Sequence, residues 1–293
     1  MFRGEGDGRW VLKPKAHRDL NAFDGFVRPS TVRMAALSLE VVGMEAESLR
    51  LFFEFADARG LFLPEDSQIL RLLLEESAAR KWGKFPPREL WSLIGLAQHS
   101  GIPTRMLDWT RSPYIGAYFA AQGAVQLVRD PGKPGPATEL VVWALNRSAF
   151  QLDSHVDEMI KASRPFDPSQ ELVFVTTPGA SNLNLQAQQG LFSLRPAFLQ
   201  APHLEPPLDR VLGSLADQLH SFIDPPSPIL LRFSMPIGEA PKLLRLLTLI
   251  GVNESVLFPS FEGAARAVKE RSEWDIPHWE YPATIAVGPA PTS

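Results

Sequence analysis

The chain has 293 residues, with 29 Lys and Arg against 33 Asp and Glu, which gives a formal net charge of −4. Apolar residues make up 45% and charged residues 21%, proportions that exclude global disorder and are typical of a globular protein. The negative net charge excludes a general electrostatic attraction to nucleic acid and leaves only a local basic patch. There is no cysteine, which removes disulfides, thiol nucleophiles and Cys-ligated zinc and fits a reducing compartment.

Neither a membrane span nor an export signal is evident. The longest apolar stretches, near residues 112–121 and 243–252, are about half as long as the roughly 20 residues that cross a bilayer as a helix. The start of the chain, MFRGEGDGRW, contains no apolar core of the kind that signal peptides need. We therefore expect a cytoplasmic protein that does not enter a membrane.

The N-terminal half is predicted to be helical after a short extended start. Residues 2–4 predict the end of a strand, and the alternating glycines that follow predict a turn. Apolar residues at helical spacing predict helices over residues 45–58, 66–80, 86–99 and 114–122. Gly101 and Pro103 end the third helix, and Ser112-Pro113 is a typical start for the fourth.

The second half contains most of the predicted strands. Strands are predicted over residues 139–145, 171–176, 190–194 and 229–233, and helices over 156–162, 240–250 and 262–272. This order favours an α+β fold, with a helical N-terminal half followed by a mostly antiparallel sheet. No linker-like composition divides the chain, so we expect one domain over residues 1–275 and a C-terminal tail over residues 276–293.

Several general catalytic motifs are absent from the sequence. There is no Walker-type phosphate loop, no His-Glu-x-x-His zinc motif and no Gly-x-Ser-x-Gly elbow of an acyl hydrolase. The six histidines are scattered, and no two of them lie four residues apart. We therefore expect no metal site.

Residues 98–110, QHSGIPTRMLDWT, are dense in polar side chains. One predicted helix ends at the start of this segment and the next begins after it. The side chains of the segment can therefore face a single cleft. The free N–H groups of the second helix favour an anion there. In a purely structural alternative, Arg105 pairs with Asp108, Trp109 lies in the core and Thr110 is a helix N-cap. For the whole segment we favour a binding role.

Four motifs, in order, resemble those of the FRG-domain family, which is named after an N-terminal Phe-Arg-Gly. They are FRG at residues 2–4, AQHSGIPTRMLDWT at 97–110 with AYFA at 117–120, AQQGLF at 187–192 and LFPSFEG at 257–263. In the last motif Ser260 replaces the acid that the family usually carries. On these motifs the chain is identified as a member of the family, with a resemblance that extends to about residue 270.

The resemblance implies a setting and a chemistry. FRG domains occur in mobile-element, toxin and phage-defence settings, and their motif order is similar to that of ADP-ribosyltransferases. That similarity implies an ADP-ribosyltransferase-like core, with NAD or another nucleotide-type small molecule as the ligand. The reaction would break the bond between nicotinamide and ribose. The group that accepts the ADP-ribose could belong to a protein or to a nucleic acid.

The implied chemistry assigns roles to individual residues. Arg3 and Gly4 suit a diphosphate, because a guanidinium forks onto phosphate oxygens and a glycine lets a ligand approach the backbone. Gln188 stands where the transferases carry a Glu, so Asp108 would supply the carboxylate and His99 the general base. The predicted catalytic residues are His99, Asp108 and Gln188, and the predicted ligand-binding residues are Arg3, Gly4, Gln98, Thr104, Arg105, Trp109, Thr110 and Tyr118. Trp109 and Tyr118 would stack on a ring.

Other interpretations of the same residues stay open. Arg3 would have a structural role if it formed a salt bridge to Asp108. The basic run at residues 9–18, beside Trp10, suits a module that binds or processes nucleic acid. An inactive interaction scaffold, with the motifs as a polar core network, is a further alternative. Family members carry a segment before Phe-Arg-Gly, so we also expect a protein partner near the N-terminal strand, which would otherwise be an uncovered edge.

Overall fold

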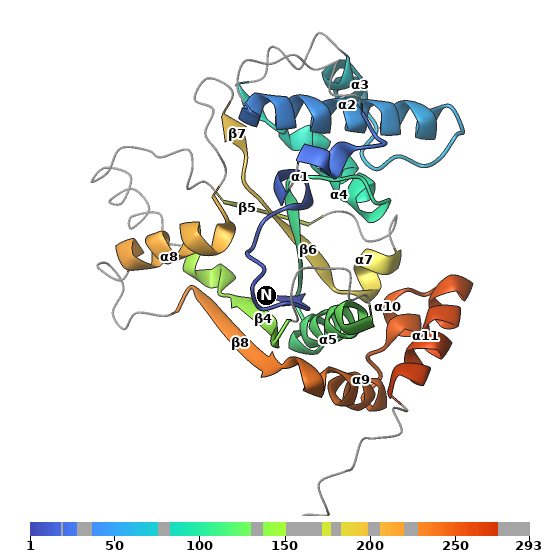
Figure 1. The fold of residues 1–293 in the computed structure, drawn as a ribbon. Helices are drawn as coiled ribbons and strands as arrows, with labels where there is room; N and C mark the ends of the chain where they lie inside the picture. The colour runs from blue at the N-terminus through green and yellow to red at the C-terminus, as the bar shows by residue number, and fades with distance from the viewer. Residues whose placement is uncertain are drawn as a thin grey trace, which may run out of the picture.

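A computed structural model describes residues 1–18, 20–27, 37–75, 83–129, 137–150, 172–176, 183–198, 206–219 and 228–274. Within these residues a six-stranded sheet has the order β5-β6-β3-β1-β4-β8, with every neighbouring pair antiparallel (Figure 1). Its strands are β1 (Phe2–Glu5), β3 (Met106–Thr110), β4 (Glu139–Leu145), β5 (Val173–Val175), β6 (Gly190–Leu194) and β8 (Leu230–Pro236). A two-stranded ribbon pairs β2 (Lys84–Phe85) with β7 (Ala197–Phe198). The predicted α+β class is confirmed.

The helices gather at two ends of the sheet. At one end lie α1 (Lys15–Arg18), α2 (Leu37–Asp57), α3 (Gln68–Leu74) and α4 (Trp91–His99), and at the other lie α5 (Pro113–Arg129), α9 (Ala240–Leu249), α10 (Glu254–Leu257) and α11 (Phe261–Trp274) (Figure 1). The other α-helices of the described residues are α7 (Leu183–Ala187) and α8 (Leu208–Leu219). In the described part of the chain, no helix combines the length and apolarity that a membrane crossing requires.

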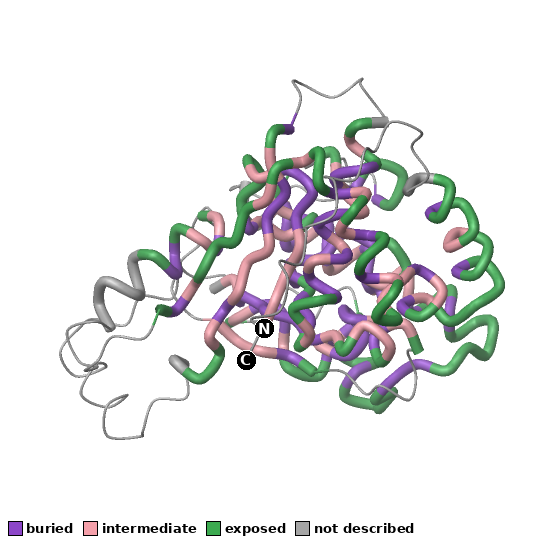
Figure 2. Tube along the Cα trace, turned by 90° about the horizontal axis from the view of Figure 1, so that it is seen from below, coloured by how far each residue is buried: buried purple, intermediate pink, exposed green. Residues whose placement is uncertain are grey.

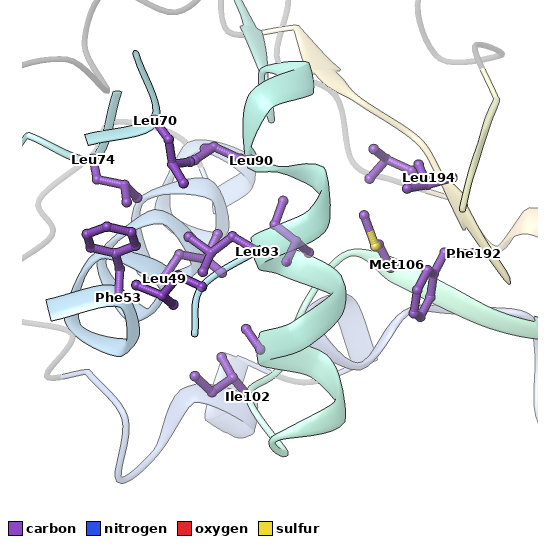
Figure 3. Close-up of a cluster of buried hydrophobic side chains, with 14 of the residues drawn as sticks. Leu49, Phe53, Leu70, Leu74, Leu90, Leu93, Ile102, Met106, Phe192 and Leu194 are labelled. Atoms are coloured by element: carbon purple, nitrogen blue, oxygen red, sulfur yellow. The ribbon is translucent and has the colours of Figure 1, made fainter. Parts of the chain in front are cut away.

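Each end has its own apolar core. Figure 3 shows the first, in which Leu49, Phe53 and Leu93 from α2 and α4 meet, while Met106 and Phe192 from the sheet approach α4 from its other side. A second core joins α5 to α9 and β4, and a third lies around Trp109 and α8. Figure 2 shows the buried segments along the middle of the molecule and the exposed ones on the outer helices. The sheet therefore connects two helical clusters.

Several predicted elements differ from the observed ones. Strands β4 and β6 have the predicted bounds, whereas β3 was not predicted, because residues 106–110 were interpreted as a turn leading into a helix. Helix α2 begins eight residues before the predicted residue 45, at Leu37, and α3 ends at Leu74. Helix α5 continues past Gly123 to Arg129. The predicted helix at 156–162 and the tail from residue 276 lie outside the described residues.

Strand β1 lies in the interior of the sheet. All four of its residues pair with β4, while Phe2 also pairs with Thr110 of β3. The prediction of an uncovered N-terminal edge is therefore wrong. The expectation of a protein partner there rested on that edge, so the structure gives no reason for it. Because β3 pairs with β1 at Phe2 alone, the two strands diverge beyond that residue and leave a wedge-shaped gap in the sheet.

Gly4 of β1 and Gly6, which follows the strand, allow α5 to pack directly on this segment. A Cβ atom at Gly4 would lie 2.0 Å from the carbonyl oxygen of Gly116, and one at Gly6 would lie 2.4 Å from the carbonyl carbon of Gly123. Both neighbours are backbone atoms of α5, which cannot move aside without shifting the helix. Gly4 is therefore required by strand–helix packing, and Gly123 is an interior contact of α5 and does not end the helix.

Candidate functional site

A cavity of about 350 Å³ lies where β1 and β3 diverge. Aromatic residues from separate parts of the chain line it, namely Phe2, Trp10, Trp109, Phe119 and Phe258. Its polar wall consists of Arg3, Glu5, His99, Asp108, Thr110 and Gln188. A concave site with mostly apolar walls and a few convergent polar groups is the usual form of a small-molecule site.

The structure brings most of the predicted site residues to this cavity. Those that line it are Arg3, Gly4, His99, Asp108, Trp109, Thr110 and Gln188. They come from β1, the end of α4, β3 and the turn after α7, so they are distant in sequence. Gln98, Thr104, Arg105 and Tyr118 do not line the cavity.

Arg3 bridges the gap between the two diverging strands. Its Nε donates to Oε1 of Glu5 at 2.7 Å, and its Nη1 donates to the peptide oxygen of Asp108 at 2.9 Å. The carboxylate Oδ2 of Asp108 lies 3.6 Å from the same Nη1. Burial alone would lower the pKa of Arg3, but the charges and hydrogen bonds of Glu5 and Asp108 outweigh it and raise that pKa. The cavity therefore contains a permanent cation that is already ion-paired.

Asp108 is held by a short relay of polar groups. The amide Nε2 of Gln98 donates to Oδ1 of Asp108 at 2.6 Å, and the hydroxyl of Thr104 donates to Oε1 of Gln98. The backbone N–H of Met106 in turn donates to the Thr104 hydroxyl. Gln98 and Thr104 are thus positioning residues behind the cavity wall. The Asp108 side chain stays 57% exposed, although it lies in the middle of an interior strand.

Arg105 is a structural residue away from the cavity, so its predicted ligand-binding role is not supported, and it pairs with Glu45 and not with Asp108 as in the structural alternative. Its Nε and its backbone N–H donate to the two carboxylate oxygens of Glu45, each at 2.8 Å. Both side chains are fully buried, and the guanidinium carbon lies 4.7 Å from the centre of the Phe85 ring. The pair fastens α2 to the start of β3. This arrangement leaves no face of Arg105 on the cavity.

Tyr118 also lies in the core, so the expected stacking position belongs to its neighbour Phe119. The Tyr118 hydroxyl donates to Oε2 of Glu254 at 2.5 Å and lies 3.2 Å from Oε2 of Glu270. Burial, followed by the hydrogen bond and the charges of these carboxylates, raises the pKa of Tyr118 far above its ordinary value. The residue therefore links α5 to α10 and α11.

His99 presents a neutral imidazole to the cavity. Burial lowers its pKa below the ordinary value of 6.5, and the charge of Asp108 only partly opposes this effect. Its Nε2 is buried and has no hydrogen-bond partner among the described residues. The ring meets Phe192 edge-on, with 6.0 Å between the ring centres. Near neutral pH, a group of this kind can accept a proton.

Gln188 and Thr110 meet at the far side of the cavity. The Thr110 hydroxyl donates to the peptide oxygen of Gln188 at 2.8 Å and accepts from the N–H of Ser112. Ser112 is the N-cap of α5, since its Oγ accepts from the N–H of Ile115, so Thr110 is not the cap that the structural alternative made it. The Gln188 amide Nε2 donates to the peptide oxygen of Leu257 at 3.3 Å. That bond directs the amide nitrogen of Gln188 towards Leu257.

The C-terminal helices complete the wall. Phe258 follows α10, and the guanidinium carbon of Arg266 lies 4.9 Å from the centre of its ring. Arg266 is itself held by Glu254 through a 2.5 Å ion pair. A Cβ atom at Gly263 would lie 1.8 Å from the peptide oxygen of Phe258. The motif at residues 257–263 therefore positions one aromatic wall and the carbonyl that orients Gln188.

Sequence reasoning missed several residues of the wall. Phe2, Phe119 and Phe258 belong to motifs that were recognised, but their direction depends on strand and helix register. Glu5 was assigned to a turn, whereas it is the last residue of β1 and only 4% exposed. The alternation of Arg3 and Glu5 along the strand is a local signal for Glu5, but the glycines that follow indicated a turn.

The basic run at residues 9–18 does not form a free patch. Arg9 contacts the carboxylate of Asp7 through both Nε and Nη2, and Arg18 donates to the peptide oxygen of Lys13 and lies 3.8 Å from Glu5. Lys15 donates to the peptide oxygen of Gly101. No specific observation in the described residues favours nucleic-acid binding by this run. Nor do those residues place three His, Asp or Glu side chains where they could hold a metal ion.

Comparison with known proteins gives one result. Residues 1–127 match the family model of the FRG domain. The match covers β1, α1 to α4, β3 and most of α5, which include the cavity residues except Gln188 and Phe258. No curated protein and no solved structure matches the chain.

Proposed function

We propose that this FRG-domain protein binds a nucleotide-type small molecule, NAD, in the cavity between β1 and β3 and breaks its nicotinamide–ribose bond. The observation that supports this proposal best is the convergence of Arg3, His99, Asp108 and Gln188 on one aromatic-walled cavity. These residues come from four separate segments, and the Asp108 side chain stays 57% exposed although Arg3 and Gln98 contact it. Such a convergence is a default sign of a binding or catalytic site.

The proposed reaction needs a negative charge near the ribose. When the bond from C1′ to the nicotinamide nitrogen breaks, the electron pair leaves with nicotinamide and positive charge develops on the ribose. The Asp108 carboxylate offsets that charge, because it is exposed to the cavity and held in place by Gln98 and Arg3. A nucleophile then bonds to C1′ and loses its proton to the neutral His99. Gln188, being an amide, contributes hydrogen bonding and no charge.

The nucleophile can be water or a group on a larger acceptor, so the enzyme is either an NAD glycohydrolase or an ADP-ribosyltransferase. A protein or nucleic-acid acceptor would approach from the exposed side of Asp108. The proposal includes the toxin or phage-defence setting that the family resemblance implies. In that setting, we expect expression of the active protein to slow bacterial growth and expression of the Asp108→Asn protein not to slow it.

The direct test measures nicotinamide released from NAD by the purified protein, with chromatography as the readout. Asp108→Asn keeps the shape of the side chain and removes its charge, and we expect the rate to fall about 10²–10³-fold, the scale for a lost electrostatic contact. Asp24→Asn, at an exposed loop position, is the matched control and should keep the full rate. A wild-type protein that neither binds nor cleaves NAD, or an Asp108→Asn protein with the full rate, would contradict the proposal.

A further inference from the structure

The guanidinium of Arg3 cannot bind a phosphate in a bidentate manner, because two of its three nitrogens already donate to other groups. A guanidinium binds phosphate in a bidentate manner through two neighbouring nitrogens with free N–H groups. In this structure Nε is occupied by Glu5 and Nη1 by the peptide oxygen of Asp108. Only Nη2 has no partner among the described residues, so Arg3 offers donors from one nitrogen and no fork.

The charges around the cavity are balanced and do not favour an anion. Arg3 and Arg18 carry positive charge, and Glu5 and Asp108 carry negative charge, with Arg18 only 3.8 Å from Glu5. The carboxylate of Asp108 is the more exposed of the two, and that of Glu5 is buried. A diphosphate in the cavity would face this exposed carboxylate without a compensating free cation.

The polar atoms that remain free are mainly acceptors. The amide nitrogen of Gln188 is directed to Leu257, so its Oε1 is left without a partner among the described residues. Asp108 contributes a second acceptor through Oδ2, because its Oδ1 already accepts from Gln98, whereas Oδ2 has only the 3.6 Å ion pair with Nη1 of Arg3, which is longer than a hydrogen bond. Ribose hydroxyls carry donors that match these acceptors, whereas an ionised phosphate carries only acceptors.

The size and the walls of the cavity fit one nucleoside. A volume of about 350 Å³ lies at the lower end of the roughly 300–1,000 Å³ range of small-molecule sites. The rings of Trp10, Phe119 and Phe258 provide apolar faces for a planar base. A cationic nicotinamide ring is attracted both to such faces and to the Asp108 carboxylate.

We propose that the cavity recognises the nucleoside end of its ligand, a planar ring with an unmodified ribose diol, and leaves the diphosphate outside. This inference rests on the proposed function and specifies which part of the nucleotide the protein binds. Gln188 accepts a hydrogen bond from the ribose diol, and the Nη2 group of Arg3 donates to a ribose oxygen. Nicotinamide riboside is then sufficient for binding.

The test compares binding of nicotinamide riboside, its 2′-deoxy analogue, NAD, ADP and inorganic pyrophosphate by calorimetry. We expect nicotinamide riboside and NAD to bind with affinities within a few-fold of each other and to compete. ADP and pyrophosphate should neither bind nor compete with NAD. The 2′-deoxy analogue should bind roughly tenfold more weakly, the effect of one hydrogen bond lost to a buried partner.

A matched pair of variants locates the effect. Gln188→Leu removes the acceptor and should abolish the discrimination between riboside and deoxyriboside, whereas Gln186→Leu, at an exposed position on α7, should keep it. If NAD and ADP bind but nicotinamide riboside does not, the inference is overturned and nucleotide binding stands. If neither NAD nor any other probe binds, the proposed function itself fails.

Discussion

The Nη1 group of Arg3 donates a 2.9 Å hydrogen bond to the peptide oxygen of Asp108, 105 residues further along the chain. The bond crosses the gap between β1 and β3, in a region where the two strands have no ladder of their own beyond the Phe2–Thr110 pair. One side chain thus links the two strands where backbone pairing is missing. The same side chain lines the cavity.

Arg3→Lys should lower the melting temperature of the ligand-free protein, because an ammonium cannot bridge Glu5 and the Asp108 carbonyl together. Arg3→Ala should cost more, up to about 3–5 kcal/mol, since the buried Glu5 loses its closest partner. Thermal and urea unfolding measure both effects. Arg9→Lys, which alters a more exposed pair with Asp7, is the control and should change stability by less than about 1 kcal/mol. Equal effects at Arg3 and Arg9 would argue against the bridge.

Gly4→Ala should prevent correct folding or lower stability severely. The added Cβ would lie 2.0 Å from a backbone oxygen of Gly116 and 2.4 Å from the amide nitrogen of Ala120, so α5 has to move away from β1. Gly213→Ala, where a Cβ would meet nothing within 4 Å, provides a helix control that should be neutral or more stable. Circular dichroism melts distinguish the two variants. A Gly4→Ala protein with the wild-type melting temperature would refute this account of the motif.

His99 should make stability depend on pH. Its pKa is lowered in the folded protein, so below the ordinary value of 6.5 the unfolded chain binds a proton that the folded protein does not. The contribution is complete above pH 6.5 and is lost as the pH falls towards the folded pKa. Urea unfolding between about pH 5 and 8 should therefore show a slope that His99→Gln reduces. An unchanged slope in the variant would mean that His99 is not held neutral.

Arg266→Ala should weaken ligand binding from outside the cavity. The guanidinium contacts the Phe258 ring and pairs with Glu254, so its loss frees one aromatic wall and disturbs the Leu257 carbonyl that orients Gln188. We expect the NAD affinity to fall several-fold. Arg266→Lys, which keeps the charge, should recover part of this affinity. Arg271→Ala, at an exposed position on the same helix, should leave binding unchanged.

Local signals were sufficient for many elements. Strands β4 and β6 have the predicted bounds, and α9 ends one residue before the predicted residue 250, because alternating or helical apolar periodicity and flanking turn residues act within a few positions. The density of polar groups at residues 98–110 was also enough to predict a cleft at this segment. These features depend on neighbouring residues alone or on composition, whereas the family resemblance added Arg3 and Gln188 to the same cleft.

Other features were decided by tertiary structure. Strand β3 carries an Asp at its centre and is stable as a strand because β6 pairs with all five of its residues, which no local pattern states. Arg105 and Tyr118 are predicted from the sequence to bind a ligand, but both are buried in the core. Arg105 donates to Glu45 there and Tyr118 donates to Glu254, and each partner is distant along the chain. A charged or hydroxylated side chain is buried only where a partner meets it. The sequence by itself determined most element types and the polar segment, and long-range pairing determined strand β3 and which polar side chains face the cavity.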